Sequence, residues 1–116
     1  MWRDDAYLLD ILIAARKARK FVEGVTSDEF QRDEVMQNAV MRQLEIVGEA
    51  ARRVCEDTRD AHPEVPWKEL VGMRNRLVHE YFRIDIRKVW EAVKNDVPAL
   101  ISVIEPLVPP DETGSG

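Results

Sequence analysis

The stretch PWKELVGMRNRLVHEYF, residues 66–82, has the pattern of one amphipathic helix. Its apolar residues recur at helical spacing, as Leu70 and Tyr81 illustrate, and they form an apolar arc along one side. Pro66 suits the first position of a helix, because the N–H that proline lacks would have no partner there. We therefore expect a helix over 67–82.

Two segments that precede this stretch carry apolar stripes of their own. The first stripe covers 8–22, and the second covers 36–54 and should stop before His62, which precedes a proline. Between the two stripes, Thr26 and Glu29 have the spacing of a capping box. This pattern predicts two long helices joined through a short extra helical turn.

A fourth apolar stripe follows the opening stretch and covers 86–104. Asp85 is a natural N-cap for it. Pro98 lies inside the stripe and should kink the helix near Asp96, because proline removes a backbone hydrogen bond. Four helices with short connections predict an all-α, antiparallel four-helix bundle.

The bundle should occupy residues 1–107, and residues 108–116 should form a disordered tail rich in proline, glycine and acidic residues. At 116 residues the chain is long enough for one domain.

No apolar stretch approaches the roughly 20 residues that cross a bilayer, so we expect no membrane span. The single cysteine, Cys55, fits a reducing compartment, and we expect a cytoplasmic protein.

The formal net charge of −5 argues against a protein that coats nucleic acid by charge alone. Binding to RNA would need a local basic patch. Arg76 and Arg83 are our candidates for RNA contacts, because they belong to a group of cations around His79. No metal ligation is expected, since Cys55, His62 and His79 lack ligand spacing.

Arg74, Asn75, His79 and Tyr81 are the candidate functional residues of the opening stretch. A guanidinium binds phosphate in a planar fork, and an imidazole transfers protons near neutral pH. Together these groups suffice to cleave a phosphodiester. A surface histidine on a bundle is the alternative for His79, and a core position is the alternative for Tyr81.

Helical geometry complicates a site made within one chain. Arg74 falls on the apolar arc, so it should be paired, for example with Gln43, or snorkel to water, or point into a functional cleft or partner surface. His79 points about 140° away from it. Arg74 and His79 could converge if the helix bends near His79, or across a symmetric dimer. Asn75 and His79 share a face and could hydrogen-bond.

Several segments together resemble the HepT-like branch of the HEPN superfamily. They are VGMRNRLVHEYF (71–82), KNDVP (94–98) and RQLEIVGEAA (42–51), and the resemblance extends over roughly residues 4–105. Such proteins are helical homodimers that act as ribonuclease toxins of type VII toxin–antitoxin systems. Their antitoxin is an MntA-like minimal nucleotidyltransferase.

The resemblance implies roles for individual residues. Arg74 and His79 would be the catalytic pair of an endoribonuclease that leaves a 2′,3′-cyclic phosphate, with Asn75 in support. His79 would act as general base or general acid, and no metal or other cofactor is implied. Tyr81 would be the tyrosine that the antitoxin modifies with AMP, which silences the toxin.

One position departs from the family pattern. Glu80 stands where related sequences often have glycine, and its carboxylate could pair with Arg76 or keep His79 protonated. Two alternatives therefore stay open. The chain could be a catalytically inactive HEPN module that binds nucleotides or docks a nucleotidyltransferase, or it could be a purely structural helical dimer.

Overall fold

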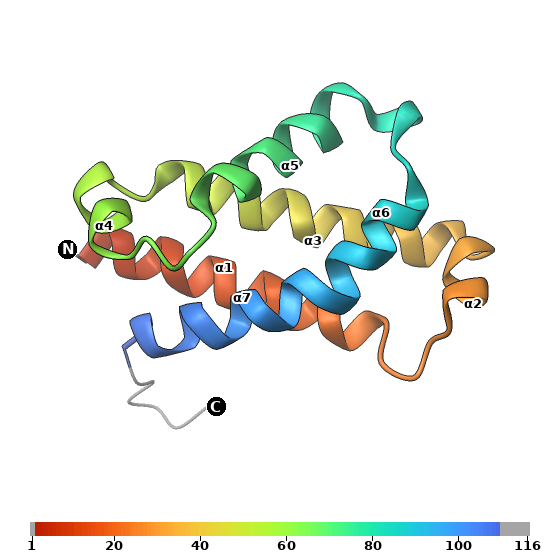
Figure 1. Ribbon diagram of the computed structural model, residues 1–116, viewed down its shortest axis with the longest axis horizontal. Helices are drawn as coiled ribbons and strands as arrows, with labels where there is room; N and C mark the ends of the chain where they lie inside the picture. The colour runs from red at the N-terminus through yellow and green to blue at the C-terminus, as the bar shows by residue number, and fades with distance from the viewer. Residues whose placement is uncertain (1, 110–116) are drawn as a thin grey trace.

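Four long helical runs pass up and down the molecule in the computed structural model, which describes residues 2–109 (Figure 1). They are α1 (Trp2–Phe21), α3 (Glu34–Arg53), α5 (Trp67–His79) and the consecutive pair α6 (Ile86–Glu91) and α7 (Val97–Ile104). Each run is antiparallel to the one before it, and the described residues contain no strand. The expected all-α four-helix bundle is confirmed.

The bundle is built on the contact between α1 and α3. α5 packs on α3 and α7 packs on α1, while α5 and α7 scarcely touch each other. Fully buried side chains such as Ile11, Val40 and Ile104 fill the space between the helices. An apolar groove of about 520 Å³ therefore remains between α5 and α7.

A short helix, α2 (Ser27–Gln31), closes one end of the bundle. The expected capping box is present: the Thr26 N–H donates to Glu29 Oε1 at 2.9 Å, and the Glu29 N–H donates to Thr26 Oγ1 at 3.1 Å. Phe30 of α2 is fully buried, and its ring centroid lies 5.2 Å from that of Trp90 in α6. This contact ties the extra helical turn to the fourth run.

The second run stops before His62, as expected, but it is interrupted. α3 ends at Arg53, and a separate short helix, α4, covers Glu56–Ala61. The buried carboxylate of Asp4 causes the break, because it accepts hydrogen bonds from the Cys55 N–H at 3.1 Å and from the Cys55 thiol at 2.9 Å. Burial raises the pKa of Asp4, but these hydrogen bonds outweigh burial and hold the pKa below its usual value.

The end of α5 differs from the sequence-based expectation. The helix begins at Trp67, directly after Pro66, and it ends at His79 rather than at 82. At Glu80 the backbone leaves the α region, with φ −123° and ψ 33°, and a 3₁₀ turn, η1, covers Tyr81–Arg83. No glycine or proline marks this end, so the apolar spacing alone suggested a longer helix.

The fourth run is irregular near Asp96, where a kink was expected. Asp85 caps α6 by accepting from the Arg87 N–H at 3.0 Å. A π-helical segment, η2 (Ala92–Asp96), then widens the run just before Pro98 in the first turn of α7. This wider turn accommodates a proline that cannot donate a backbone hydrogen bond.

The described chain ends after a last 3₁₀ turn, η3 (Glu105–Leu107). Val108 follows it and packs against the core. The expected tail, 108–116, lies outside the described residues from 110 onward. None of the described helices is long and apolar enough to cross a bilayer.

Candidate functional site

The crossing of α3 and α5 is set by Gly48. A Cβ atom at this position would lie 2.2 Å from the Cβ of Arg74 and 2.6 Å from the carbonyl oxygen of Leu70. Since real Cβ contacts are never so short, only glycine lets the two helices approach this closely. The close approach brings the side chain of Arg74 beside the residue that follows Gly48 on α3.

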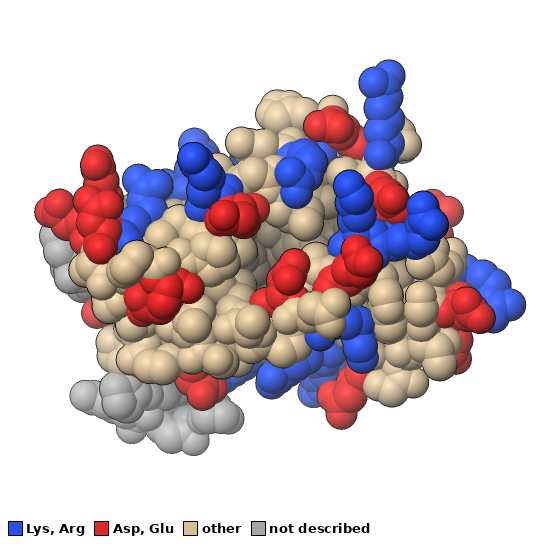
Figure 2. Space-filling model, viewed as in Figure 1, with Lys and Arg blue, Asp and Glu red and all other residues tan. Residues whose placement is uncertain are grey.

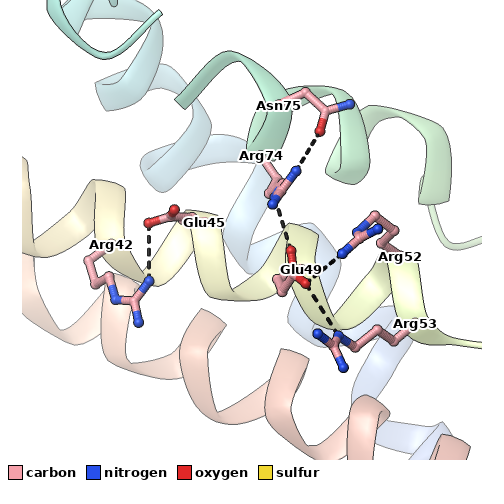
Figure 3. Close-up of polar contacts among 7 residues, drawn as sticks. All are labelled: Arg42, Glu45, Glu49, Arg52, Arg53, Arg74 and Asn75. Atoms are coloured by element: carbon pink, nitrogen blue, oxygen red, sulfur yellow. Dashed lines mark hydrogen bonds and ion pairs between the residues drawn. The ribbon is translucent and has the colours of Figure 1, made fainter. Parts of the chain in front are cut away.

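That residue is Glu49, and it is the partner of Arg74. Nε of Arg74 lies 3.0 Å from Glu49 Oε2, and Nη1 donates to Asn75 Oδ1 at 3.0 Å (Figure 3). Only 23% of the Arg74 side chain is exposed, so it does not lie on the solvated face. The expectation of a partner for Arg74 is correct, but Gln43 was the wrong one because the crossing at Gly48 lies about one and a half turns further along α3.

Glu49 also binds two arginines of its own helix. Its Oε1 atom lies 2.8 Å from Arg52 Nη2 and 3.3 Å from Arg53 Nε (Figure 3). The hydrogen bond from Arg52, together with that from Arg53 and the charges of Arg52 and Arg74, holds the pKa of Glu49 below its usual value. One carboxylate thus faces three guanidinium groups, and the cluster keeps a net positive charge.

The guanidinium of Arg74 is therefore held but not saturated. Nε forms an ion pair with Glu49 but is buried without a hydrogen bond, Nη1 donates to Asn75, and the described residues place no partner at Nη2. Glu49 fixes the direction of the group, because an ion pair between two half-buried side chains is less screened than one in water. A positioned cation with a free N–H is suited to binding an anion such as phosphate.

His79 is the last residue of α5, and its side chain is exposed. The described residues make no hydrogen bond or ion pair to its imidazole. The expected bond from Asn75 is wrong, because Asn75 Oδ1 accepts from Arg74 instead. Five residues separate Arg74 from His79 along α5, which is about 140° around an ideal helix, and the described residues form no hydrogen bond between the two side chains.

Tyr81 lies in η1, two residues beyond His79. Its hydroxyl donates to Asn38 Oδ1 on α3 at 2.9 Å, and 47% of the residue is exposed. The alternative that Tyr81 belongs to the core is therefore wrong. The helix ends before Tyr81, so the residue no longer follows the apolar arc of α5.

Arg76 and Arg83, which lie before and after His79 in the sequence, are both exposed. Arg76 borders the groove between α5 and α7, whose rim also carries Glu69 and Asp96. Figure 2 shows this face hollowed, with acidic and basic side chains around the hollow. The expected pairing of Glu80 with Arg76 does not form among the described residues.

Sequence reasoning missed Gly48, Glu49 and Asn38 as residues that position the site. Gly48 carried a usable signal, because a glycine inside an apolar helical stripe often marks a close helix approach. Glu49 and Asn38 carried none, since their partners come from α5 and η1. Among the described residues, no group of three or more His, Cys, Asp or Glu could hold a metal ion.

Comparisons with known proteins place the whole bundle in one family. The family model for HepT-like proteins, described as "Ribonuclease HepT-like", matches residues 11–107. The chain is 44% identical over 100 residues to "Putative RNase MJ1380" of Methanocaldococcus jannaschii, covering 86% of this chain and 92% of that protein. It is 41% identical over 101 residues to "Probable ribonuclease HepT" of Thermococcus cleftensis, covering 87% and 92%.

No solved structure matches the chain significantly. The family model nevertheless spans both helices that build the Arg74 cluster, and the two relatives cover almost the same region. The chain belongs to the HepT-like ribonuclease family.

Proposed function

We propose that the chain is a metal-independent endoribonuclease and the toxin of a type VII toxin–antitoxin pair. Arg74 and His79 are its catalytic residues, and they meet in a cleft between two copies of the chain. The proposal rests on the family and on the names of its relatives, which describe ribonucleases. The observation that carries it is the guanidinium of Arg74, held by Glu49 with Nη2 free for a phosphate oxygen.

The chemistry requires only these two side chains and water. The neutral imidazole of His79 takes the proton of a ribose 2′-hydroxyl, and the 2′-oxygen attacks the adjacent phosphorus. The bond from phosphorus to the 5′-oxygen breaks, and the leaving oxygen takes a proton from water. Arg74 stabilises the charge that develops on the phosphoryl oxygens, and the products are a 2′,3′-cyclic phosphate and a 5′-hydroxyl.

Two copies are needed because Arg74 and His79 diverge on one helix. In a symmetric dimer, Arg74 of one protomer can face His79 of the other, and each dimer then has two such sites. The groove between α5 and α7 supports this assembly, since Leu70, Met73 and Leu100 give it an apolar lining beside the helix that carries both residues. Light scattering should give the mass of a dimer, and Ala99→Arg, a change at an exposed position in this groove, should give a monomer.

Arg76 and Arg83 contact the RNA backbone in this proposal, and Asn75 supports Arg74. The exposed cations compensate for the overall net charge of −5 by giving the site a local positive potential. Asn75 already accepts from Arg74, so it helps to orient the guanidinium. RNA is the substrate rather than DNA, because DNA lacks the attacking 2′-hydroxyl.

Tyr81 is the switch. An MntA-like minimal nucleotidyltransferase would transfer AMP from ATP to its hydroxyl: the tyrosine oxygen attacks the α-phosphorus and pyrophosphate leaves. The half-exposed Tyr81 hydroxyl supports this role, since a single hydrogen bond to Asn38 is all that holds it. AMP two residues from His79 would bring negative charge and bulk to the place where RNA binds.

The experiment compares wild type with Arg74→Ala and His79→Ala on RNA in EDTA. Wild type should cleave and leave cyclic phosphate ends, whereas both variants should lose activity by a factor of about 10²–10⁴. His62→Ala is the matched control, because His62 lies in a loop where Glu64 is its ion-pair partner, and it should cleave like wild type. Intact RNA with wild type, or full cleavage by His79→Ala, would contradict the proposal.

The second candidate is an inactive module that docks a nucleotidyltransferase. The carboxylate of Glu80 beside His79 is the observation that favours it. Modification of Tyr81 by the partner and ATP, together with no cleavage of RNA by the unmodified protein, would select this candidate. Both candidates place the protein in the cytoplasm, where ATP and RNA are present.

A further inference from the structure

Phe82 is the most exposed of the large apolar side chains that the structure describes. Its exposed fraction is 97%, so almost the whole ring is in water. Exposed aliphatic side chains are common on protein surfaces, but a phenylalanine ring that touches so little of its own protein is unusual. The Phe82 ring is therefore open to a binding partner outside the chain.

The ring nevertheless has a defined place. Phe82 lies in the 3₁₀ turn η1, which projects beyond the end of α5 at the edge of the molecule (Figure 1). Its ring centroid lies 5.2 Å from that of Tyr81, and the two rings are perpendicular. The Tyr81 hydroxyl is in turn bound to Asn38, so the aromatic pair is anchored to α3.

The charges around Phe82 favour an anionic ligand. Arg76 and Arg83 flank it in the sequence, and neither has an ion pair among the described residues. Glu80 is the opposing charge, and Asp85 is already engaged by Arg87, whose Nε lies 3.6 Å from its carboxylate. An open aromatic ring beside free arginines is the combination that binds single-stranded nucleic acid, in which bases stack and phosphates pair with cations.

We propose that Phe82 is a stacking platform for a nucleobase of single-stranded RNA, and that it sets where the strand lies relative to His79. The inference rests on the proposed function and names a base-binding position for it. Phe82 is the third residue after His79, so their Cα atoms lie at most about 10 Å apart, or about three nucleotide steps of a stacked strand. The base that stacks on Phe82 therefore lies within a few nucleotides of the cleaved bond.

The test uses a fully 2′-O-methylated single-stranded RNA, which binds but cannot be cleaved. Phe82→Ala should weaken its affinity about fivefold to a hundredfold, the range found for loss of a stacked base. Phe82→Trp should bind as tightly as wild type or more tightly, and the fluorescence of the added tryptophan should change when RNA is bound. Phe82→Leu should bind as weakly as Phe82→Ala, because leucine is apolar but has no aromatic face.

Phe21→Ala is the matched control. Phe21 is another exposed phenylalanine, at the end of α1, and its truncation should leave RNA affinity unchanged. Equal affinity of wild type and Phe82→Ala would overturn the inference. Full RNA affinity of Phe82→Leu would also overturn it, because a leucine has no aromatic face. A Phe82→Ala protein that keeps its RNA affinity but no longer has the mass of a dimer would overturn it too, because the ring would then serve a protein contact.

These outcomes separate the inference from the proposed function. If wild type cleaves RNA and Phe82→Ala binds and cleaves equally well, the stacking platform fails and the ribonuclease stands. If the methylated strand binds in a Phe82-dependent way but no RNA is ever cleaved, the ribonuclease fails and the base-binding position stands.

Discussion

Replacing Gly48 with alanine tests how α3 and α5 position Arg74. The added Cβ would lie 2.2 Å from the Cβ of Arg74 and 2.6 Å from the carbonyl oxygen of Leu70. Carbon atoms pack at about 3.5–4.0 Å, so α5 must move away from α3 by roughly 1.5 Å. Because one of the two obstacles is backbone, a side-chain rotation cannot relieve the clash.

The magnitude follows from two opposing effects. Overpacking in a well-packed interface costs about 2–3 kcal/mol in the severe cases, and the gain in helix propensity from glycine to alanine returns about 1 kcal/mol. The net destabilisation is about 1–2 kcal/mol, which for a domain of this size lowers Tm by roughly 5–15 °C. Ribonuclease activity should also fall, even at temperatures where the variant stays folded, because the movement separates Arg74 from Glu49.

Gly72→Ala is the matched control, in the middle of α5. A Cβ at position 72 would meet no other atom within 4 Å, so the same substitution should raise stability by about 0.5–1 kcal/mol. Urea unfolding and thermal unfolding followed by circular dichroism would measure both variants. If Gly48→Ala is as stable as wild type, or if the two variants shift stability equally, the account of the helix crossing is wrong.

Three further predictions concern named contacts. Glu49 has a lowered pKa in the folded state, so its ion pairs stabilise the protein above about pH 4.5, and this stabilisation is lost as pH falls through the folded pKa. In Glu49→Gln, the urea midpoint of unfolding should therefore fall less steeply below that pH than in wild type. An equally steep fall in the variant would show that the Glu49 ion pairs do not cause the loss of stability in acid. Asp4→Asn should cost about 1–3 kcal/mol in thermal unfolding, because the amide NH2 that replaces Oδ2 cannot accept from the Cys55 thiol or the Thr58 hydroxyl; no loss of Tm would contradict this. Tyr81→Phe removes the hydrogen bond to Asn38, so its free energy of unfolding should fall by at most about 1 kcal/mol and its ribonuclease activity should be kept. After incubation with an MntA-like partner and ATP, mass spectrometry should show no added AMP on this variant. Modification equal to that of wild type would exclude Tyr81 as the target.

The elements that could be predicted from the sequence are those with local causes. Thr26 and Glu29 cap α2 through their own side chains, Asp85 caps α6, and Pro98 disturbs the run that contains it. Each of these signals acts within one or two turns of the chain, so neighbouring residues are sufficient to recognise it. The four apolar stripes likewise predicted the four helical runs of the bundle.

The features that could not be predicted depend on residues distant in the sequence. The break at Cys55 is made by Asp4, which lies 51 residues earlier. The partner of Arg74 depends on where α5 crosses α3, and the exposure of Tyr81 depends on the helix ending at His79. Helical spacing predicts faces within one helix, but it does not predict crossings or ends that other helices impose.

The spacing argument was right about the burial of Arg74. It placed Arg74 on the inner side of its helix and His79 on another face, and in the structure Arg74 is half-buried whereas His79 is exposed at the helix end. We propose that a second copy of the chain supplies the missing member of the pair. This proposal makes the shared site the central claim.

The most direct test is complementation between two inactive variants. Arg74→Ala and His79→Ala chains, each with its own affinity tag, would be expressed together, and the dimers that carry both tags would be purified. If each site takes Arg74 from one protomer and His79 from the other, the mixed dimer has one intact site of two and should cleave RNA at about half the wild-type rate. If Arg74 and His79 act within one protomer, the mixed dimer has no intact site, and absence of cleavage would contradict the account.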